Sequence, residues 1–241
     1  ELALSWAPSP QWRLFARSAR SARLPGWNLL ARTSAELVLL PAETGWHHQV
    51  GVKAELWDGR VRLDASGFAA RTRALVSPLF GIDPLAMALA ATLRLDMTNH
   101  GADVTLEARP LDRLELAATL GWQQARWTGA VPATAPMRPL YAPDSTASLS
   151  AAWRQPLVGT GSVLVPRVAA RWRSAMAVGP ALGLTDGMSP GGWQVAAALQ
   201  LEIPDGGWLT SLECENCLDQ MLTEGAVVGL PTLNPPRWWQ L

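Results

Sequence analysis

The feature that most limits what this chain can fold into is a strict alternation of apolar and polar residues within residues 41–75. From residue 49 to residue 56 every second side chain is apolar, at Val50, Val52, Ala54 and Leu56. Asp58-Gly59, a dipeptide that reverses a strand in two residues, follows, and the alternation resumes at Val61. A period of two is typical of a strand with one apolar and one polar face, so this stretch predicts an antiparallel pair.

The same unit recurs along the whole chain and predicts about eleven antiparallel strands. The connections alternate in length: those near residues 8, 58, 111, 158 and 205 are short, and those near residues 32, 82, 136, 184 and 226 are long. All short turns therefore belong to one rim of an up-and-down sheet. Strands of about ten residues at about 3.3 Å each, tilted by about 45°, reach about 23 Å, close to the apolar band of an outer-membrane barrel.

Composition agrees with contact with lipid. The chain of 241 residues is 49 % hydrophobic and only 17 % charged, and it holds thirteen Trp against one Tyr and three Phe. No apolar run is long enough for a transmembrane helix, and no secretory signal opens the chain, so we expect it to begin after any targeting segment. Indole rings prefer the boundary between hydrocarbon and water, which predicts two interface girdles. The expected girdle residues are Trp6, Trp12, Trp57, Trp122, Trp153, Trp172, Trp193 and Trp208.

The sequence predicts an all-β, antiparallel, up-and-down transmembrane β-barrel of about eleven strands, with short periplasmic turns and long extracellular loops. A soluble β-sandwich binding module remains an alternative. It requires a second sheet to bury the apolar face, represented by Val52, Leu63, Val104, Leu116 and Leu199. A porin-like passive channel would have the same strands and is the other alternative.

Local strings resemble the TonB-dependent receptors, which import ferric siderophores, haem, cobalamin and some sugars through the outer membrane. Pro41-Ala42-Glu43-Thr44 with the later Gly51-Val52-Lys53 is similar to the family's "PET…E-G-K" strand, with Gln49 in place of its final glutamate. Residues 215–219 resemble its "ENLFD" string, with Cys217 and Leu218 where Leu and Phe are usual. Pro236-Arg237-Trp238 is similar to the start of its last strand, and Tyr141-Ala142-Pro143-Asp144 to the lead-in to a late strand.

The resemblance implies energised uptake, across the bacterial outer membrane, of a ferric siderophore or a similarly large and scarce nutrient. Receptors of this family close about twenty-two strands around a plug. Residues 1–241 are therefore expected to be the C-terminal part of such a barrel, a partial barrel without the plug domain. The expected partners are outer-membrane lipid, a ferric chelate, and the TonB complex reached through the missing N-terminal part. A net charge of zero gives no argument for nucleic-acid binding.

Candidate ligand-binding residues lie at the expected extracellular end of the first strands. Indole and imidazole at Trp46, His47 and His48 would contact a chelate or haem, unless these residues belong to the interface girdle. A basic cluster would attract an anionic chelate or lipopolysaccharide phosphates, unless it is a solvated loop; it consists of Arg17, Arg20 and Arg23. Three further arginines are expected to line the lumen: Arg167, Arg171 and Arg173.

Nothing in the sequence indicates an enzyme, a cofactor or a metal site. No Ser/His/Asp set, phosphate-binding glycine loop or carboxylate pair stands out, so no catalytic residue is assigned. Cys214 and Cys217 have the spacing of a redox or metal pair, but no second pair or nearby histidine completes a zinc site. In an extended strand their Cα atoms would be about 10 Å apart, too far for a disulfide unless the chain turns at Glu215-Asn216.

Overall fold

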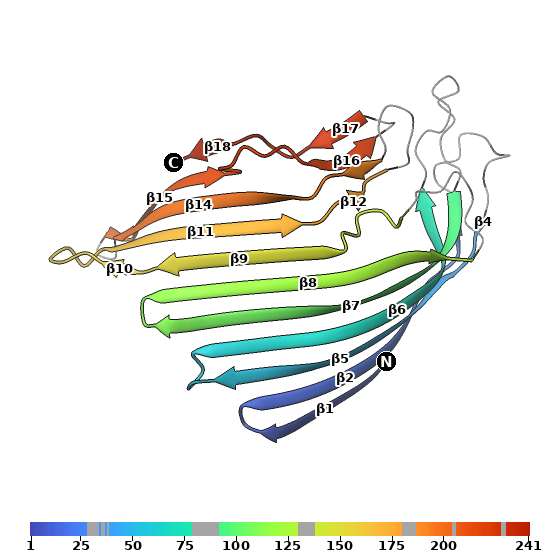
Figure 1. Ribbon diagram of the computed structural model, residues 1–241, viewed down its shortest axis with the longest axis horizontal. Helices are drawn as coiled ribbons and strands as arrows, with labels where there is room; N and C mark the ends of the chain where they lie inside the picture. Colours follow the sequence, from blue (N-terminus) through green and yellow to red (C-terminus); the bar gives the residue numbers. More distant parts are fainter. Residues whose placement is uncertain are drawn as a thin grey trace.

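The computed structural model is all-β, with one large antiparallel sheet and three small two-stranded sheets (Figure 1). It describes residues 1–27, 34, 37, 39–78, 92–129, 138–179, 187–203, 206–227 and 230–241. Within these ranges, no helix has the length and apolarity needed to cross a membrane.

The large sheet follows the chain in order, each strand pairing with the next. Its path is β1 (Leu2–Ser9), β2 (Trp12–Arg23), β5 (Glu43–Leu56), β6 (Val61–Pro78), β7 (Thr92–Leu111), β8 (Leu114–Thr128), β9 (Ser145–Trp153), β11 (Val163–Arg173), β14 (Gly192–Ile203), β15 (Trp208–Glu215) and β18 (Trp238–Gln240). The short β10 (Gln155–Pro156) pairs with β11 off this path. The predicted all-β fold and its eleven strands are confirmed, and the barrel is not closed, because β1 and β18 are the two ends of the path.

The antiparallel pair predicted within residues 41–75 is formed by β5 and β6. β5 and β6 pair from Leu56↔Val61 to Thr44↔Arg73 without a bulge, so the apolar positions of both strands share one face. The predicted two-residue reversal is wrong. Residues 57–60 form the turn, with left-handed φ at Trp57, Asp58 and Gly59, and the Arg60 N–H donates to the Trp57 carbonyl over 3.0 Å. Asp and Gly tolerate this conformation better than most residues, which explains why they occur here.

The alternation of connection lengths is also confirmed. Short connections cover residues 10–11, 57–60, 112–113, 154–162 and 204–207, whereas long ones cover 24–42, 79–91, 129–144, 174–191 and 216–237. Figure 1 shows the short turns at one end of the strands and the long connections at the other. We call these ends the turn rim and the loop rim. The predicted loop centres near residues 32, 82, 136 and 184 lie outside the described residues.

Several strands are longer than the ten residues expected. β6, β7 and β8 contain 18, 20 and 15 residues. Their extra length lies at the loop rim, where the sequence has polar residues on both faces, such as Thr72 and Arg73. Hydrogen bonding to a neighbouring strand continues there although the apolar alternation has ended.

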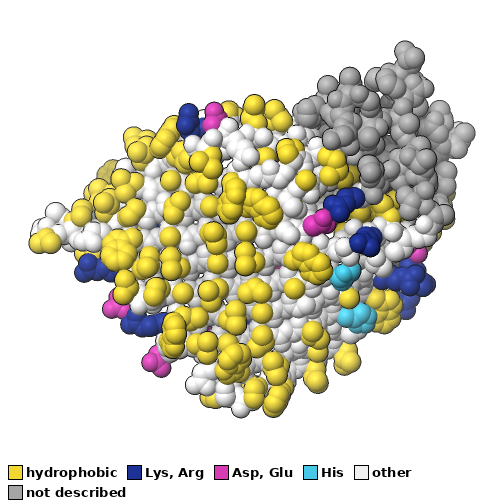
Figure 2. All heavy atoms as spheres, in the orientation of Figure 1, with side chains coloured by type: hydrophobic (Ala, Val, Ile, Leu, Met, Phe, Trp, Pro, Cys, Tyr) yellow, Lys and Arg dark blue, Asp and Glu magenta, His cyan; other side chains and the backbone are white. Residues whose placement is uncertain are grey.

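The large sheet has no conventional core. Apolar side chains on one face remain open, with Val104, Leu116 and Leu199 38 %, 39 % and 45 % exposed. Figure 2 shows rows of such side chains across this face. Among the described strands no second sheet covers it, so the packing that a soluble β-sandwich requires is not found.

One group of buried side chains lies at the loop rim, beside the small sheets. These pair β3 (Gly26–Trp27) with β4 (Leu39–Leu40), β12 (Met176–Ala177) with β13 (Met188–Ser189), and β16 (Thr223–Val227) with β17 (Leu230–Leu233). Met176, Ala177, Val178 and Leu222 are each less than a tenth exposed. The connections after β11 and β15 thus carry a small core of their own.

Candidate functional site

The two faces of the large sheet differ in chemistry. Directly paired residues on neighbouring strands share a face, so each row of partners can be followed across the sheet. One row contains Leu14, Val52, Ala65, Val104, Leu120, Ala147, Trp172 and Trp193. The adjacent row contains Arg13, Lys53, Asp64, Thr105, Thr119, Ser148, Arg171 and Gln194. We call the faces that carry these rows the apolar face and the polar face.

Tryptophans mark both ends of the apolar face. Near the turn rim are Trp6, Trp12, Trp57, Trp153 and Trp208, with Trp57 in the turn itself. Nearer the loop rim are Trp46, Trp122, Trp172 and Trp193. Most of these rings are exposed, including Trp208 at 70 % and Trp122 at 50 %. The eight positions expected to form girdles thus fall into two groups separated by apolar strand segments.

The six residues proposed as ligand contacts divide between the two faces. Arg20 pairs with Trp46, and Ser18 pairs with His48, in register with the apolar positions of β2 and β5. Trp46 stacks on His48 with ring centroids 5.9 Å apart, and the guanidinium of Arg20 lies 5.8 Å from the Trp46 ring centroid. Arg20, Trp46 and His48 are therefore on the apolar face.

The other three members of that set are on the polar face. His47 is half-buried and stacks on Phe68, with ring centroids 6.1 Å apart. Arg17 pairs with Glu1 over 2.9 Å, and Arg23 lies 3.6 Å from Glu43. These two arginines each have an acidic partner, which weakens their attraction for an incoming anion compared with free cations.

Amide side chains surround His47 on the polar face, and sequence analysis did not identify them. Gln49 donates to the Ser66 hydroxyl over 3.0 Å, and Asn99 donates to the Gln123 side-chain carbonyl over 2.9 Å. The Asn99 side-chain oxygen is buried and has no hydrogen-bond partner among the described residues. A single amide in an alternating strand resembles any polar-face residue. Asn99 differs from other polar-face residues because it pairs with Ala70, which in turn pairs with His47, so that the three residues lie in one row.

A second feature of the polar face is a groove of about 480 Å³ towards the turn rim. Its charged lining consists of Glu107, Arg109, Glu115, Arg167, Glu213 and Glu215. Arg109 and Glu115 form an ion pair of 3.0 Å. The groove is thus a mixed, mainly acidic surface on the wall of the expected lumen.

The three arginines of β11 lie on the polar face, as the lumen prediction requires. Arg167 lines the acidic groove. Arg173 donates to the Ser189 hydroxyl over 2.8 Å and to the Thr223 carbonyl over 3.0 Å. These bonds join the end of β11 to two long connections, so Arg173 has a structural role at the loop rim.

Comparison with known proteins identifies the family. The model of the family described as "TonB dependent receptor-like, beta-barrel" matches residues 2–210. The chain belongs to the TonB-dependent receptor-like β-barrel family. No curated protein matches the chain in sequence.

Solved structures of TonB-dependent receptors resemble this chain over 98 % of its length. The ferric yersiniabactin uptake receptor FyuA from Yersinia pestis superposes with a TM-score of 0.80 at 14 % identity, with 35 % of its chain covered. The closed form of the ferric-catecholate import receptor Fiu from Escherichia coli K12 gives 0.75 at 15 % identity and 33 %. The ferric preacinetobactin receptor BauA from Acinetobacter baumannii gives 0.71 at 14 % identity and 34 %. The chain thus has the fold of these receptors and spans about a third of their length.

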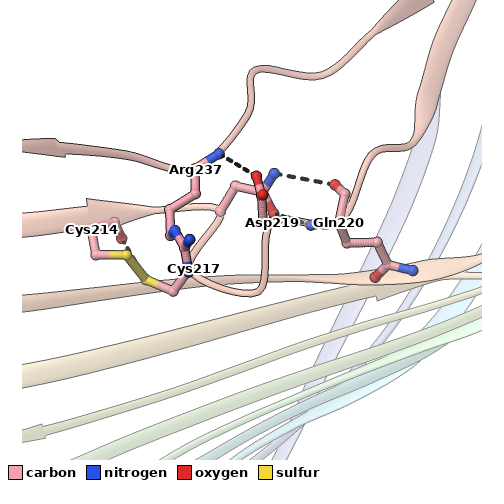
Figure 3. Close-up of a disulfide and its surroundings, with 6 residues drawn as sticks. Cys214, Cys217, Asp219, Gln220 and Arg237 are labelled. Atoms are coloured by element: carbon pink, nitrogen blue, oxygen red, sulfur yellow. Dashed lines mark hydrogen bonds between the residues drawn. A yellow bond between two sulfur atoms is a disulfide. The ribbon is translucent and has the colours of Figure 1, made fainter.

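The TonB-dependent receptor strings near residues 215–238 meet in space. Asp219 accepts a hydrogen bond from the Arg237 backbone N–H (Figure 3). The Asn216 side chain donates to the Pro235 carbonyl over 3.0 Å. Gln220 N–H donates to the Asn216 side-chain oxygen over 3.1 Å. In this TonB-dependent receptor chain the string at 215–219 is therefore the turn that positions the start of β18.

The two cysteines of this string form a disulfide, with Cα atoms 5.7 Å apart. The sequence allows a disulfide between these cysteines only if the chain turns at Glu215-Asn216. The chain does turn there, because φ of Asn216 is 47°. Among the described residues, no three His, Cys, Asp or Glu side chains form a metal-binding group. The disulfide thus joins the end of β15 to the turn that follows it.

Proposed function

We propose that this chain forms the C-terminal part of an outer-membrane barrel that imports a ferric siderophore under the control of TonB. The observation that carries the proposal is the family match over residues 2–210 on a sheet with one apolar face between two groups of tryptophans. That face has the chemistry of a wall in contact with lipid. The rest of the receptor, including a plug and the strands that close the barrel, is proposed to come from sequence outside residues 1–241.

We further propose that the ligand passes the polar face near His47. An aromatic and imidazole pair, His47 with Phe68, lies next to the side-chain amides of Gln49 and Asn99. Such a surface offers donors, acceptors and a ring face to a polar chelate. Arg17 and Arg23 lie on the same face and would contribute positive charge, reduced by Glu1 and Glu43.

The test is uptake of radioactive iron by iron-starved cells that carry the complete receptor gene in a background without other receptors. A panel of ferric siderophores, ferric citrate and haem identifies the ligand. We expect saturable uptake of one chelate class that stops when the proton-motive force is dissipated. Uptake that continues without the proton-motive force would instead identify a passive channel, and no uptake of any iron compound would contradict the proposal.

Consecutive histidines provide a matched pair of variants for the ligand path. His47→Ala changes the polar face, whereas His48→Ala removes the same side chain from the apolar face. We expect His47→Ala to raise the concentration of chelate needed for half-maximal uptake about tenfold, equivalent to about 1.4 kcal/mol of binding. His48→Ala should leave that concentration unchanged. Equal effects of the two changes would place the ligand path elsewhere.

A further inference from the structure

Four arginines and two histidines form a basic band at the loop-rim end of the apolar face. Its members are Arg20, His48, Arg71, Arg73, His100 and Arg126. Pairing places them on that face: Arg20↔Trp46, Trp46↔Arg71, Arg71↔Thr98 and Thr98↔Arg126 form one row, and His48↔Ala69 and Ala69↔His100 belong to the next. The band therefore crosses five neighbouring strands, from β2 to β8.

Towards the loop rim the apolar residues of this face are followed by an arginine on β2, β6 and β8, and by a histidine on β5 and β7. On β6 the apolar-face residues run from Val61 to Ala69 and are followed by Arg71 and Arg73. On β8 they run from Leu114 to Trp122 and are followed by Gln124 and Arg126. The change recurs in strands joined by different loops, so one surface boundary crosses them all.

The depth of this boundary matches the thickness of an outer-membrane apolar band. From Val61 to Arg71 is about ten residues, which at about 3.3 Å each and a tilt of about 45° is roughly 23 Å. The band of a barrel is about 25 Å tall. The arginines are therefore at the level of lipid headgroups at the extracellular surface, and Trp46 and Trp122 lie beside them.

The positive charge of this band is not balanced within the described part of the chain. Arg20, Arg71, Arg73 and Arg126 are all exposed, and none of the ion pairs found among the described residues includes them. In the described parts of these five strands, Asp96 is the acidic residue on the same face, and its carboxylate accepts the Ala74 N–H over 3.0 Å. A hollow of about 780 Å³ lies over the band, lined by Arg20, Trp46, His48, Arg71, Arg73 and His100 among others.

We propose that this band binds the phosphorylated headgroup of an anionic lipid of the outer leaflet, such as lipid A. Guanidinium groups bind phosphate through paired hydrogen bonds, and several of them across neighbouring strands match a headgroup with more than one phosphate. The acyl chains of the lipid lie along the apolar rows below. This site rests on the proposed outer-membrane location and not on which ligand is imported.

The test measures lipid bound to the protein purified in detergent, using lipid A with both phosphates, lipid A without phosphates, and inorganic phosphate. We expect the double variant Arg71→Gln/Arg126→Gln to bind at least fivefold less phosphorylated lipid A than the parent. The matched control, Arg13→Gln/Arg62→Gln, removes two charges from the polar face and should bind as the parent does. Tryptophan fluorescence and resistance to proteolysis verify that both variants fold.

Three results would overturn the proposal. Equal loss in both double variants would mean that only net charge matters. Equal binding of lipid A without phosphates would mean that only apolar contact matters. Displacement of lipid A by inorganic phosphate at equal molar concentration would mean that the site takes free phosphate. Iron uptake is measured separately, so an inactive importer that still binds phosphorylated lipid A would refute the proposed function and leave this site standing.

Discussion

The side-chain oxygen of Asp219 lies 2.9 Å from the backbone nitrogen of Arg237, which donates a hydrogen bond to it. Eighteen positions of chain separate the two residues, and the intervening β16 and β17 form a hairpin of their own. The Asp219 carboxylate thus joins the turn after β15 to Arg237, the residue just before β18. β18 is the strand that pairs with β15. The interaction connects two sequence strings that resemble the receptor family when considered separately.

Replacing this carboxylate should loosen β18. Asp219→Ala removes the acceptor of the Arg237 N–H and replaces a residue with φ of 53° by one that disfavours it. We expect a loss of about 1 kcal/mol, seen as faster hydrogen exchange at Trp238 and Gln240. Asp219→Asn keeps an oxygen acceptor and tolerates the same backbone, so its exchange should stay close to that of the parent. Identical exchange in both variants would show that the bond does not hold β18.

A close contact on the polar face predicts a destabilising glycine substitution. A Cβ at Gly51 would lie 2.5 Å from the Phe15 ring and 2.7 Å from the Ala65 carbonyl oxygen. Gly51→Ala should therefore cost about 1–3 kcal/mol in urea unfolding. Phe15→Ala in the same chain should recover part of this cost. Gly67→Ala is the control, because a Cβ there would lie 3.7 Å from the nearest atom, the Gly101 carbonyl oxygen, and it should change stability by no more than about 0.5 kcal/mol.

Consecutive residues of β7 test the assignment of the lipid-facing surface. Val104 is on the apolar face and Thr105 on the polar face, each near the middle of the strand. Val104→Lys should cost about 2–4 kcal/mol in vesicles, whereas Thr105→Lys should cost about 1 kcal/mol or less. Unfolding in lipid vesicles, followed by tryptophan fluorescence, measures both. If Thr105→Lys is the costlier change, the apolar face is not the one in contact with lipid.

The disulfide should contribute modestly to stability because it closes a short loop. Cys214→Ser/Cys217→Ser is expected to lower the free energy of unfolding by about 2 kcal/mol, mainly by freeing the unfolded chain. Reductant should reproduce this loss in the parent and have no effect on the double variant. A reductant effect of the same size in the double variant would assign it to something other than this bond.

The sequence predicts most of the sheet because one face is apolar and the other polar along many residues, which gives a long alternation. The alternate apolar residues from Val50 to Leu56 and from Val61 to Ala69 lie on one face, as expected. The alternation of short and long connections is also as predicted. The expected length of about ten residues is too short for β6 and β7, because at their loop-rim ends residues such as Arg71 and Thr72 have no apolar contrast between faces. Pairing there depends on the neighbouring strand, which a single strand's sequence does not contain.

The candidate site residues divide between the two faces for a related reason. Trp46, His47 and His48 are consecutive, and a period of two necessarily places His47 opposite to the other two. Whether each residue contacts ligand remains a prediction, but the three do not form one cluster. Asn99 and Arg126 were missed because each becomes notable only beside partners from other strands, His47 for the first and Arg71 for the second.

The order of the sheet has a directional consequence. Successive strands reverse, so in a path of eleven the first and last strands, β1 and β18, point the same way, from the loop rim towards the turn rim. If these two edges joined directly they would form a parallel ladder. A cylinder that stays antiparallel throughout therefore requires an odd number of additional strands between β18 and β1, and its total strand number is even.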